Sequence, residues 1–293
     1  MIEVSASHAA DVAGMPVRRA LPRAGRRTVG AWCFVDHMGP VTTTAGAGLD
    51  VSPHPHIGLQ TVTWLFEGEA LHRDSLGTEQ PIRPGQLNLM TAGRGIVHSE
   101  EGLGRNGGTV HGVQLWVAQP ERTRHGDAAF EHRAELPRFD SATISGTVLV
   151  GEFAGVSSPA RRDTDHVGVD LRLRAGRGVV ELDPSFEYAL VMFDGAVGVA
   201  DHEAQMTPGH LAFLGAGRAE LALDAPGDAH GLLLGGLPFE SAISMWWNFV
   251  ARSHAELEDA NRDWRSGSDR FVDPASPFPR VSSPDTPWSS PPR

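Results

Sequence analysis

The chain has 293 residues and a formal net charge of −11 at pH 7, from 36 acidic and 25 basic side chains. It contains no lysine and a single cysteine, Cys33, which excludes pyridoxal-phosphate enzymes, lysine-dependent phosphate loops, intramolecular disulfides and multi-cysteine metal sites. The acidic balance also argues against direct nucleic-acid binding, because it would repel a phosphate backbone.

Short β-branched and aromatic segments, separated by glycine and proline, predict an all-β fold. Clear examples are residues 61–66, 110–117, 168–173 and 188–193. No apolar run approaches the ~20 residues that a membrane span needs, and the N-terminus lacks the pattern of a signal peptide. Since there is no disulfide framework either, we expect a cytoplasmic protein.

The last part of the chain predicts one long helix and an unfolded tail. After Phe239, apolar residues that include Trp246, Trp247 and Val250 recur at helical spacing, which predicts a helix over 239–266 anchored by its tryptophans. The final 20 residues contain seven prolines and five serines. We therefore expect residues 267–293 to be disordered.

An internal repeat divides the remainder of the chain into two similar β-domains. Residues 84–94 align without gaps to residues 208–218, and six of the eleven positions are identical. The glycine turns around both segments follow in the same order. The repeat predicts one domain over residues 1–133 and a second over 134–238.

Two short motifs in the first copy have the spacing of metal ligands. His54-Pro55-His56 is an i, i+2 pair, which a strand directs to one face. His98-Ser99-Glu100 repeats this spacing, and places His98 and Glu100 on one face of a later strand. If the two strands are neighbours in one barrel, three imidazoles and one carboxylate converge in its interior.

This ligand set would leave a divalent ion with a residual charge of about +1 and open coordination positions. Iron(II) suits it best, with manganese, nickel, cobalt or copper as further candidates. The alternative is a hydrogen-bonded polar barrel mouth without an ion. Counted from the glycine turns, the second copy has Glu181, Asp183, Ala222 and Asp224 at the matching positions. We therefore expect one ion per chain, in the first domain.

Three other polar residues lie near these motifs in the sequence. Gln60 follows His56 by four residues, so on one continuous strand it would face inward and could hydrogen-bond near the ion. His111 could orient a metal ligand through a hydrogen bond. His72 is predicted to be a solvated residue of a turn between two strands.

Four segments together resemble the pirin family of the cupin superfamily: residues 36–40 (DHMGP), 54–65, 72–77 and 90–100. The resemblance implies two tandem cupin-type β-barrels followed by a helix. It also implies one iron-type site in the N-terminal barrel, with His54, His56, His98 and Glu100 as the ligands, and a C-terminal barrel without metal.

The resemblance implies two different functions. Some pirins resemble flavonol dioxygenases, which open quercetin with molecular oxygen and release carbon monoxide. In such an enzyme the flavonol would chelate the ion, and Glu100 could act both as a ligand and as the general base for the 3-hydroxyl proton. The alternative, implied by the resemblance to eukaryotic pirins, is a non-enzymatic protein that senses redox state through its iron and regulates another protein by binding to it.

Overall fold

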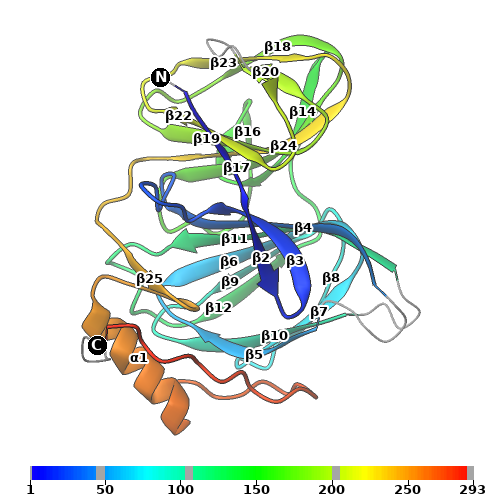
Figure 1. Ribbon diagram of the computed structural model, residues 1–293. Helices are drawn as coiled ribbons and strands as arrows, with labels where there is room; N and C mark the ends of the chain where they lie inside the picture. The colour runs from blue at the N-terminus through cyan, green and yellow to red at the C-terminus, as the bar shows by residue number, and fades with distance from the viewer. Residues whose placement is uncertain (1, 44–49, 103–107, 200–204, 289–293) are drawn as a thin grey trace.

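The computed structural model describes residues 2–43, 50–102, 108–199 and 205–288. These residues form two β-barrels, which Figure 1 shows one above the other, with the N-terminal barrel below. Both barrels consist of antiparallel strands, so the predicted all-β fold with tandem cupin-type barrels is confirmed.

The first barrel contains two sheets. The seven-stranded sheet has the order β12 (Ala129–Arg133), β9 (Leu87–Thr91), β6 (Leu59–Glu67), β11 (Gly108–Ala118), β4 (Trp32–Thr43), β3 (Met15–Leu21) and β2 (His8–Val12). The four-stranded sheet has the order β5 (Val51–His56), β10 (Ile96–Gly102), β7 (Ala70–Asp74) and β8 (Glu79–Ile82).

The second barrel repeats this arrangement. Its seven-stranded sheet has the order β1 (Glu3–Ala6), β22 (His210–Gly215), β19 (Glu187–Asp194), β24 (Ala229–Gly236), β17 (His166–Leu173), β14 (Ile144–Val150) and β13 (Arg138–Asp140). Its four-stranded sheet has the order β18 (Gly176–Glu181), β23 (Glu220–Ala225), β20 (Val197–Val199) and β21 (Gln205–Met206). A short hairpin of β15 (Glu152–Phe153) and β16 (Val156–Ser157) follows β14.

The two seven-stranded sheets pack against each other between the barrels. Alternate residues of β6 divide between the two faces of its sheet: Val62 and Trp64 join the apolar cluster between the barrels, whereas Thr63 faces the interior of the first barrel. Trp64 donates its indole N–H to Asp170 of the second barrel over 3.0 Å. Because both faces of the sheet are covered, β6 is buried over most of its length.

The N-terminal strand packs on the second barrel, and the C-terminal segment packs on the first. Strand β1 lies within the segment predicted as the first domain, yet it pairs with β22 at the edge of the second barrel's sheet, with Glu3 opposite Phe213. Figure 1 shows this strand in dark blue beside the upper barrel. The segment after residue 238, in orange and red, lies against the lower barrel instead.

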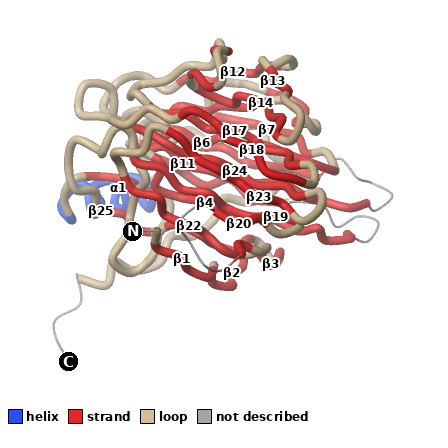
Figure 2. The backbone as a smooth tube through the Cα atoms, turned by 90° about the horizontal axis from the view of Figure 1, so that it is seen from above, coloured by secondary structure: helices blue, strands red, loops and turns tan. Residues whose placement is uncertain are grey.

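The predicted helix is shorter than expected. Helix α1 spans His254–Ser266, with Ser253 as its N-cap and Gly267 in the left-handed conformation at its end. The prediction of a helix over 239–266 is wrong for its first half, which forms a hairpin of β25 (Ser244–Trp246) and β26 (Phe249–Ala251). Figure 2 shows α1 at one side of the layered strands. No helix among the described residues is long and apolar enough to span a membrane.

The C-terminal tail is packed over most of its length. Phe271 is buried with α1 and β26, Val281 bonds to Pro53 through its backbone, and Trp288 stacks on His254 with ring centroids 4.2 Å apart. The predicted disorder is therefore wrong for residues 267–288, because tail aromatic and backbone groups find partners on the first barrel. Residues 289–293 lie outside the described part of the chain.

Candidate metal centre

A cavity of about 680 Å³ opens into the first barrel and is lined by all four predicted ligands. His54 and His56 lie on β5, whereas His98 and Glu100 lie on β10. The two strands are antiparallel neighbours, and His98 stands directly opposite His54. Since residues two apart on a strand share a face, the structure brings both sequence motifs to one side of this sheet.

The three histidines form the tightest cluster in the cavity. Each offers one ring nitrogen, and these three atoms lie within 4.8 Å of one another. In the described ranges, no other group of three or more His, Cys, Asp or Glu side chains offers ligand atoms at such spacing. Convergent imidazoles are a common ligand set for divalent transition metals.

Burial keeps the three imidazoles neutral. It lowers the pKa of His54 to about 4, and it lowers the pKa values of His56 and His98 well below the ordinary value of 6.5. Repulsion between the neighbouring rings adds to the effect for His56 and His98. At neutral pH the cluster is therefore in the protonation state that a metal ion requires.

Hydrogen bonds turn the imidazole lone pairs toward the cavity. The Nδ1–H of His54 donates to the Ser52 carbonyl and that of His56 to the Asn248 carbonyl, each over 2.9 Å. Because a carbonyl only accepts, the Nε2 atom of each neutral ring carries a lone pair. The Nε2 atoms of His56 and His98 lie 3.1 Å apart, and Nδ1 of His98 lacks a hydrogen-bond partner among the described residues. Lone pairs that converge in this way fit a bound cation.

Glu100 lies beside the three histidines in the same cavity. Its Oε1 accepts a hydrogen bond of 3.2 Å from the Thr63 hydroxyl. Burial raises the pKa of its carboxyl above the ordinary value of 4.5, although His72 and Thr63 oppose the shift. Glu100 is not a member of the close histidine group. Its carboxylate lies next to the histidine cluster, where it can accept hydrogen bonds and take up a proton more readily than an exposed glutamate.

His72 is a site residue that the sequence interpretation missed. The prediction of a solvated turn is wrong, because residues 70–74 form strand β7 and His72 is only 2% exposed. Its Nε2 lies 3.0 Å from Asp74, and its ring centroid lies 5.3 Å from that of His98. The His72-Arg73-Asp74 spacing could have revealed it, since it repeats the i, i+2 pattern of the other two motifs.

One wall of the cavity is aromatic and carries an ion pair. Phe34 and Trp116 stack with centroids 4.0 Å apart and planes 13° apart, and Trp116 meets the ring of His56 edge to face. Above Phe34, the Arg19 guanidinium lies 4.4 Å from the ring centroid and bonds to both oxygens of Asp36 at 2.7 Å. The wall offers a flat apolar face next to charged groups.

Comparison with known families covers both barrels. Residues 14–117 match the family described as Pirin, and residues 168–272 match the Pirin C-terminal cupin domain. The chain belongs to the pirin family. The first match contains β5 and β10 with the histidine cluster, and the second extends from β17 through α1. The resemblance seen in the sequence is thus confirmed.

Relatives of this pirin-family chain share nearly its whole length. A Pseudomonas aeruginosa protein named "Putative quercetin 2,3-dioxygenase PA1205" is 46% identical over 286 residues, which cover 96% of this chain and 90% of that protein. Human pirin is 27% identical and covers 88% of this chain, which in turn covers 89% of human pirin. A crystal structure of quercetin 2,3-dioxygenase from Acinetobacter baumannii has a TM-score of 0.94 and 41% identity, with coverage of 99% and 97%.

Strand registers align the interiors of the two barrels. His98 stands opposite His54 in the first barrel, and Leu223 stands opposite Gly178 in the second. Leu223 belongs to the second barrel's core, together with Leu221 and Ala225 of the same strand. The matching positions expected from the sequence are wrong for Glu181 and Asp224, because both side chains are exposed while their neighbours Val180, Leu223 and Ala225 face the core. A shift of one residue moves every side chain to the opposite face.

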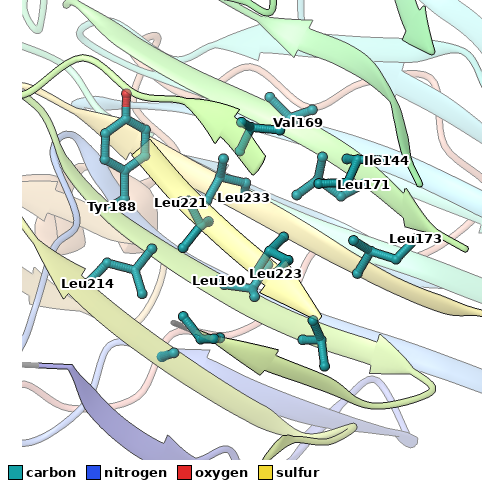
Figure 3. Packing of buried hydrophobic residues seen from close by; sticks show 14 of the residues in the cluster. Ile144, Val169, Leu171, Leu173, Tyr188, Leu190, Leu214, Leu221, Leu223 and Leu233 are labelled. Atoms are coloured by element: carbon teal, nitrogen blue, oxygen red, sulfur yellow. The ribbon is translucent and has the colours of Figure 1, made fainter. Parts of the chain in front are cut away.

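At six interior positions the first barrel is polar and the second is apolar. The first-barrel residues are His54, His56, His72, Asp74, His98 and Glu100. The interior residues of the corresponding strands in the second barrel are Val180, Val197, Val199, Leu221, Leu223 and Ala225. Figure 3 shows the aliphatic side chains that fill the second barrel, Leu223 among them. These apolar side chains offer no ligand atoms to an ion.

Gln60 and His111 do not lie among the cavity residues. The prediction that Gln60 continues the strand of His56 is wrong, because the chain turns at Gly58 between β5 and β6 and the Gln60 amide donates to Thr91 over 3.0 Å. The Nε2 of His111 lies 2.9 Å from the Nε2 of His37. His111 thus belongs to a histidine pair at the junction of the two barrels rather than to the cavity.

Proposed function

We propose that the first barrel binds one divalent ion, iron(II) by preference, and that this pirin-family chain is a metal-dependent dioxygenase of flavonols. His54, His56 and His98 would bind the ion through Nε2, and Glu100 through its carboxylate. The observation that carries the proposal is the convergence of three buried, neutral imidazoles inside an open cavity. The names of the relatives from Pseudomonas and Acinetobacter support flavonol as the substrate class.

The proposed mechanism assigns a proton carrier to the cavity. When bound, the ion supplies Lewis-acid stabilisation for a deprotonated substrate hydroxyl. Thr63 donates to Oε1 of Glu100, which leaves Oε2 to accept the proton of the flavonol 3-hydroxyl. Because burial raises the pKa of Glu100, its carboxylate is a stronger base than an exposed glutamate.

The cavity wall suits a flat, polyhydroxylated ring system. The stacked rings of Phe34 and Trp116 present an apolar face that excludes water beside His56. Asp36 and Arg19 hold opposite charges at the same wall, where they can bond to ring hydroxyls. The cavity volume of about 680 Å³ is within the range of sites for ligands of this size.

Oxygen uptake and carbon monoxide release with quercetin test this proposal directly. We expect both in the iron-loaded chain and neither in the His98→Ala variant. Glu100→Gln should lower the turnover rate by roughly 10²-fold or more, since a positioned general base contributes about that much. Glu101→Gln is the matched control, because Glu101 bonds to Arg73 and Ser276 on the other face of the same strand.

Two outcomes would overturn the proposal. Turnover that survives the loss of His98 would show that the cluster is not the reaction centre. A wild-type chain that binds iron but consumes no oxygen with quercetin would favour the alternative, an iron-dependent partner of another protein. In that case, affinity for the partner should differ between the iron(II) and iron(III) forms.

A further inference from the structure

The strand that carries two of the three histidines is an edge strand. β5 pairs with β10 on one side only, at the end of the order β5-β10-β7-β8. The free side of an edge strand exposes backbone N–H and C=O groups, and such strands fray or slip more readily than central strands. The positions of His54 and His56 therefore depend on whatever covers this edge.

The C-terminal segment covers it at three points. The Val281 N–H donates to the Pro53 carbonyl over 2.9 Å, and the Val250 N–H donates to the Ile57 carbonyl over 3.1 Å. Between these two bonds, the Asn248 carbonyl accepts the Nδ1–H of His56 over 2.9 Å. Figure 1 shows the orange and red segment running beside β5. Residues from beyond the second barrel thus complete the edge of the first.

The C-terminal hairpin approaches the end of β5 closely, and there is no space for a side chain between them. Gly58 has a φ of +66°, and a Cβ atom at this position would lie 2.2 Å from the Val250 carbonyl oxygen. Phe249 forms a parallel bridge with Ile57 and is fully buried. Glycine is thus required at the point where the C-terminal hairpin meets the end of β5.

The turn that presents the Asn248 carbonyl is strained. Trp247 and Asn248 form the two-residue connection between β25 and β26, and Trp247 has a φ of +53°. A bulky side chain rarely adopts this left-handed conformation, and such strain concentrates at functional sites. Trp247 and Asn248 both line the cavity, so the strained turn lies at the histidine cluster itself.

Packing further along the tail holds these contacts in place. The indole N–H of Trp264 on α1 donates to the Val281 carbonyl over 3.0 Å. Arg265 donates to the carbonyls of Ser283 and Pro284 over 3.0 and 2.7 Å. α1 therefore holds the tail directly after the Val281 N–H that bonds to β5.

We propose that the C-terminal segment is a positioning element of the metal centre. The Asn248 carbonyl fixes the tautomer and the rotation of His56, and Val281 holds the backbone of the strand that carries both ligands. Removal of either contact should weaken ion binding although all four ligands remain. The inference rests on the metal site of the proposed function, but it does not depend on the substrate or on turnover.

Cobalt(II) binding to the full chain tests the inference with two matched pairs of variants. Val281→Pro removes the N–H donor to Pro53. Its control, Ser282→Pro, places a proline at the next residue, whose N–H has no backbone hydrogen bond within the described chain. Asn248→Gly loosens the turn that carries the carbonyl, whereas Asn248→Ala retains a Cβ. The affinity is measured by chelator competition, the ligand geometry by the visible absorption of cobalt(II), and the folding by the melting temperature without metal.

We expect one cobalt(II) ion per wild-type chain. Val281→Pro and Asn248→Gly should bind it several-fold to roughly tenfold more weakly, because each loosens the support of a ligand, and complete loss of a ligand's outer partner typically costs 10–100-fold in affinity. Their cobalt(II) spectra should change, and both control variants should match the wild type.

Equal affinity and an equal spectrum in all five proteins would overturn the inference and leave the proposed function intact. Normal cobalt(II) binding without oxygen uptake by the iron-loaded wild type would overturn the proposed function alone. A wild-type chain that binds no ion would overturn both. If Val281→Pro fails to fold without metal, the comparison of Asn248→Gly with Asn248→Ala decides.

Discussion

The two barrels have the same strand order but opposite interiors. In the first, histidines and carboxylates surround a cavity of about 680 Å³, and Nδ1 of His98 has no hydrogen-bond partner among the described residues. In the second, the interior residues of the corresponding strands are valine, leucine and alanine, and a continuous aliphatic core fills the space. At Gly178 on β18, a Cβ atom would lie 2.5 Å from the Thr143 hydroxyl, so even an alanine would be crowded.

This difference shows that one β-scaffold can hold either a histidine-lined cavity or a stabilising core. Buried polar side chains without partners reduce stability, whereas buried aliphatic side chains increase it. The second barrel is therefore expected to contribute more of the stability, and the first barrel the chemistry. Each prediction below alters one side of this comparison.

The largest effect is expected when interior residues of the first barrel are replaced by residue types from the interior of the second barrel. The double variant His98→Leu/Glu100→Ala should lose the ion, so that metal content falls from about one to below roughly 0.1 per chain. Its free energy of unfolding without metal should rise by about 1–3 kcal/mol, since the variant removes a buried nitrogen that has no partner. Elemental analysis and urea denaturation measure the two effects. A variant that retains metal would contradict the assignment of the site.

The reciprocal change affects stability alone. Leu223→Ala removes a side chain that is 1% exposed in the second core, and the cavity it leaves should cost about 2–5 kcal/mol of unfolding free energy. Metal content per folded chain should be unchanged, because the histidine cluster lies in the other barrel. Loss of metal at full folding would show that the two interiors are coupled.

The His72–Asp74 pair should show a smaller effect. His72→Val, which installs the residue type of Val197, leaves the buried Asp74 carboxylate without one partner and should cost about 1–3 kcal/mol. In a double-mutant cycle with Asp74→Asn, the coupling between the two side chains should be at least about 0.5 kcal/mol. Additive losses, measured by urea denaturation, would indicate that the pair does not interact.

The smallest effect is expected from pH. Burial lowers the pKa of His166 in the second barrel to about 4, so this residue stays neutral in the folded chain while the unfolded chain takes up a proton near pH 6.5. Its contribution to stability is therefore complete above pH 6.5 and is lost progressively as the pH falls toward 4. Between pH 7 and 6, His166→Phe should reduce the fall in unfolding free energy by roughly 0.7 kcal/mol. An unchanged pH profile would contradict the buried, neutral state.

Local spacing predicted the parts of the site that depend on strand geometry. The pairs His54/His56 and His98/Glu100 need only the alternation of a strand, and the glycine turns were sufficient to detect the repeat. The same alternation failed for Gln60, because a turn at Gly58 interrupts the strand. It also failed for the matching residues of the second barrel, where Glu181 and Asp224 are exposed and their neighbours face the core.

Tertiary contacts decided what the sequence could not. Trp246, Trp247 and Val250 have helical spacing, but packing against Ile57 selects a hairpin with a strained turn. The proline- and serine-rich tail has the composition of a disordered segment, yet Phe271 is buried in the cluster between α1 and the first barrel, and Trp288 stacks on His254 of α1. Neither outcome follows from a local pattern, because both depend on contacts with distant strands.

The exchange of termini between the barrels has a consequence for biosynthesis. A nascent chain releases the strand with His54 and His56 from the ribosome more than 200 residues before Val281, which bonds to that strand. Likewise, β1 emerges first but must wait for β22. The N-terminal barrel thus cannot mature on its own during translation. For the ion binding proposed above, capture should then be among the last steps, after the C-terminal segment has reached β5.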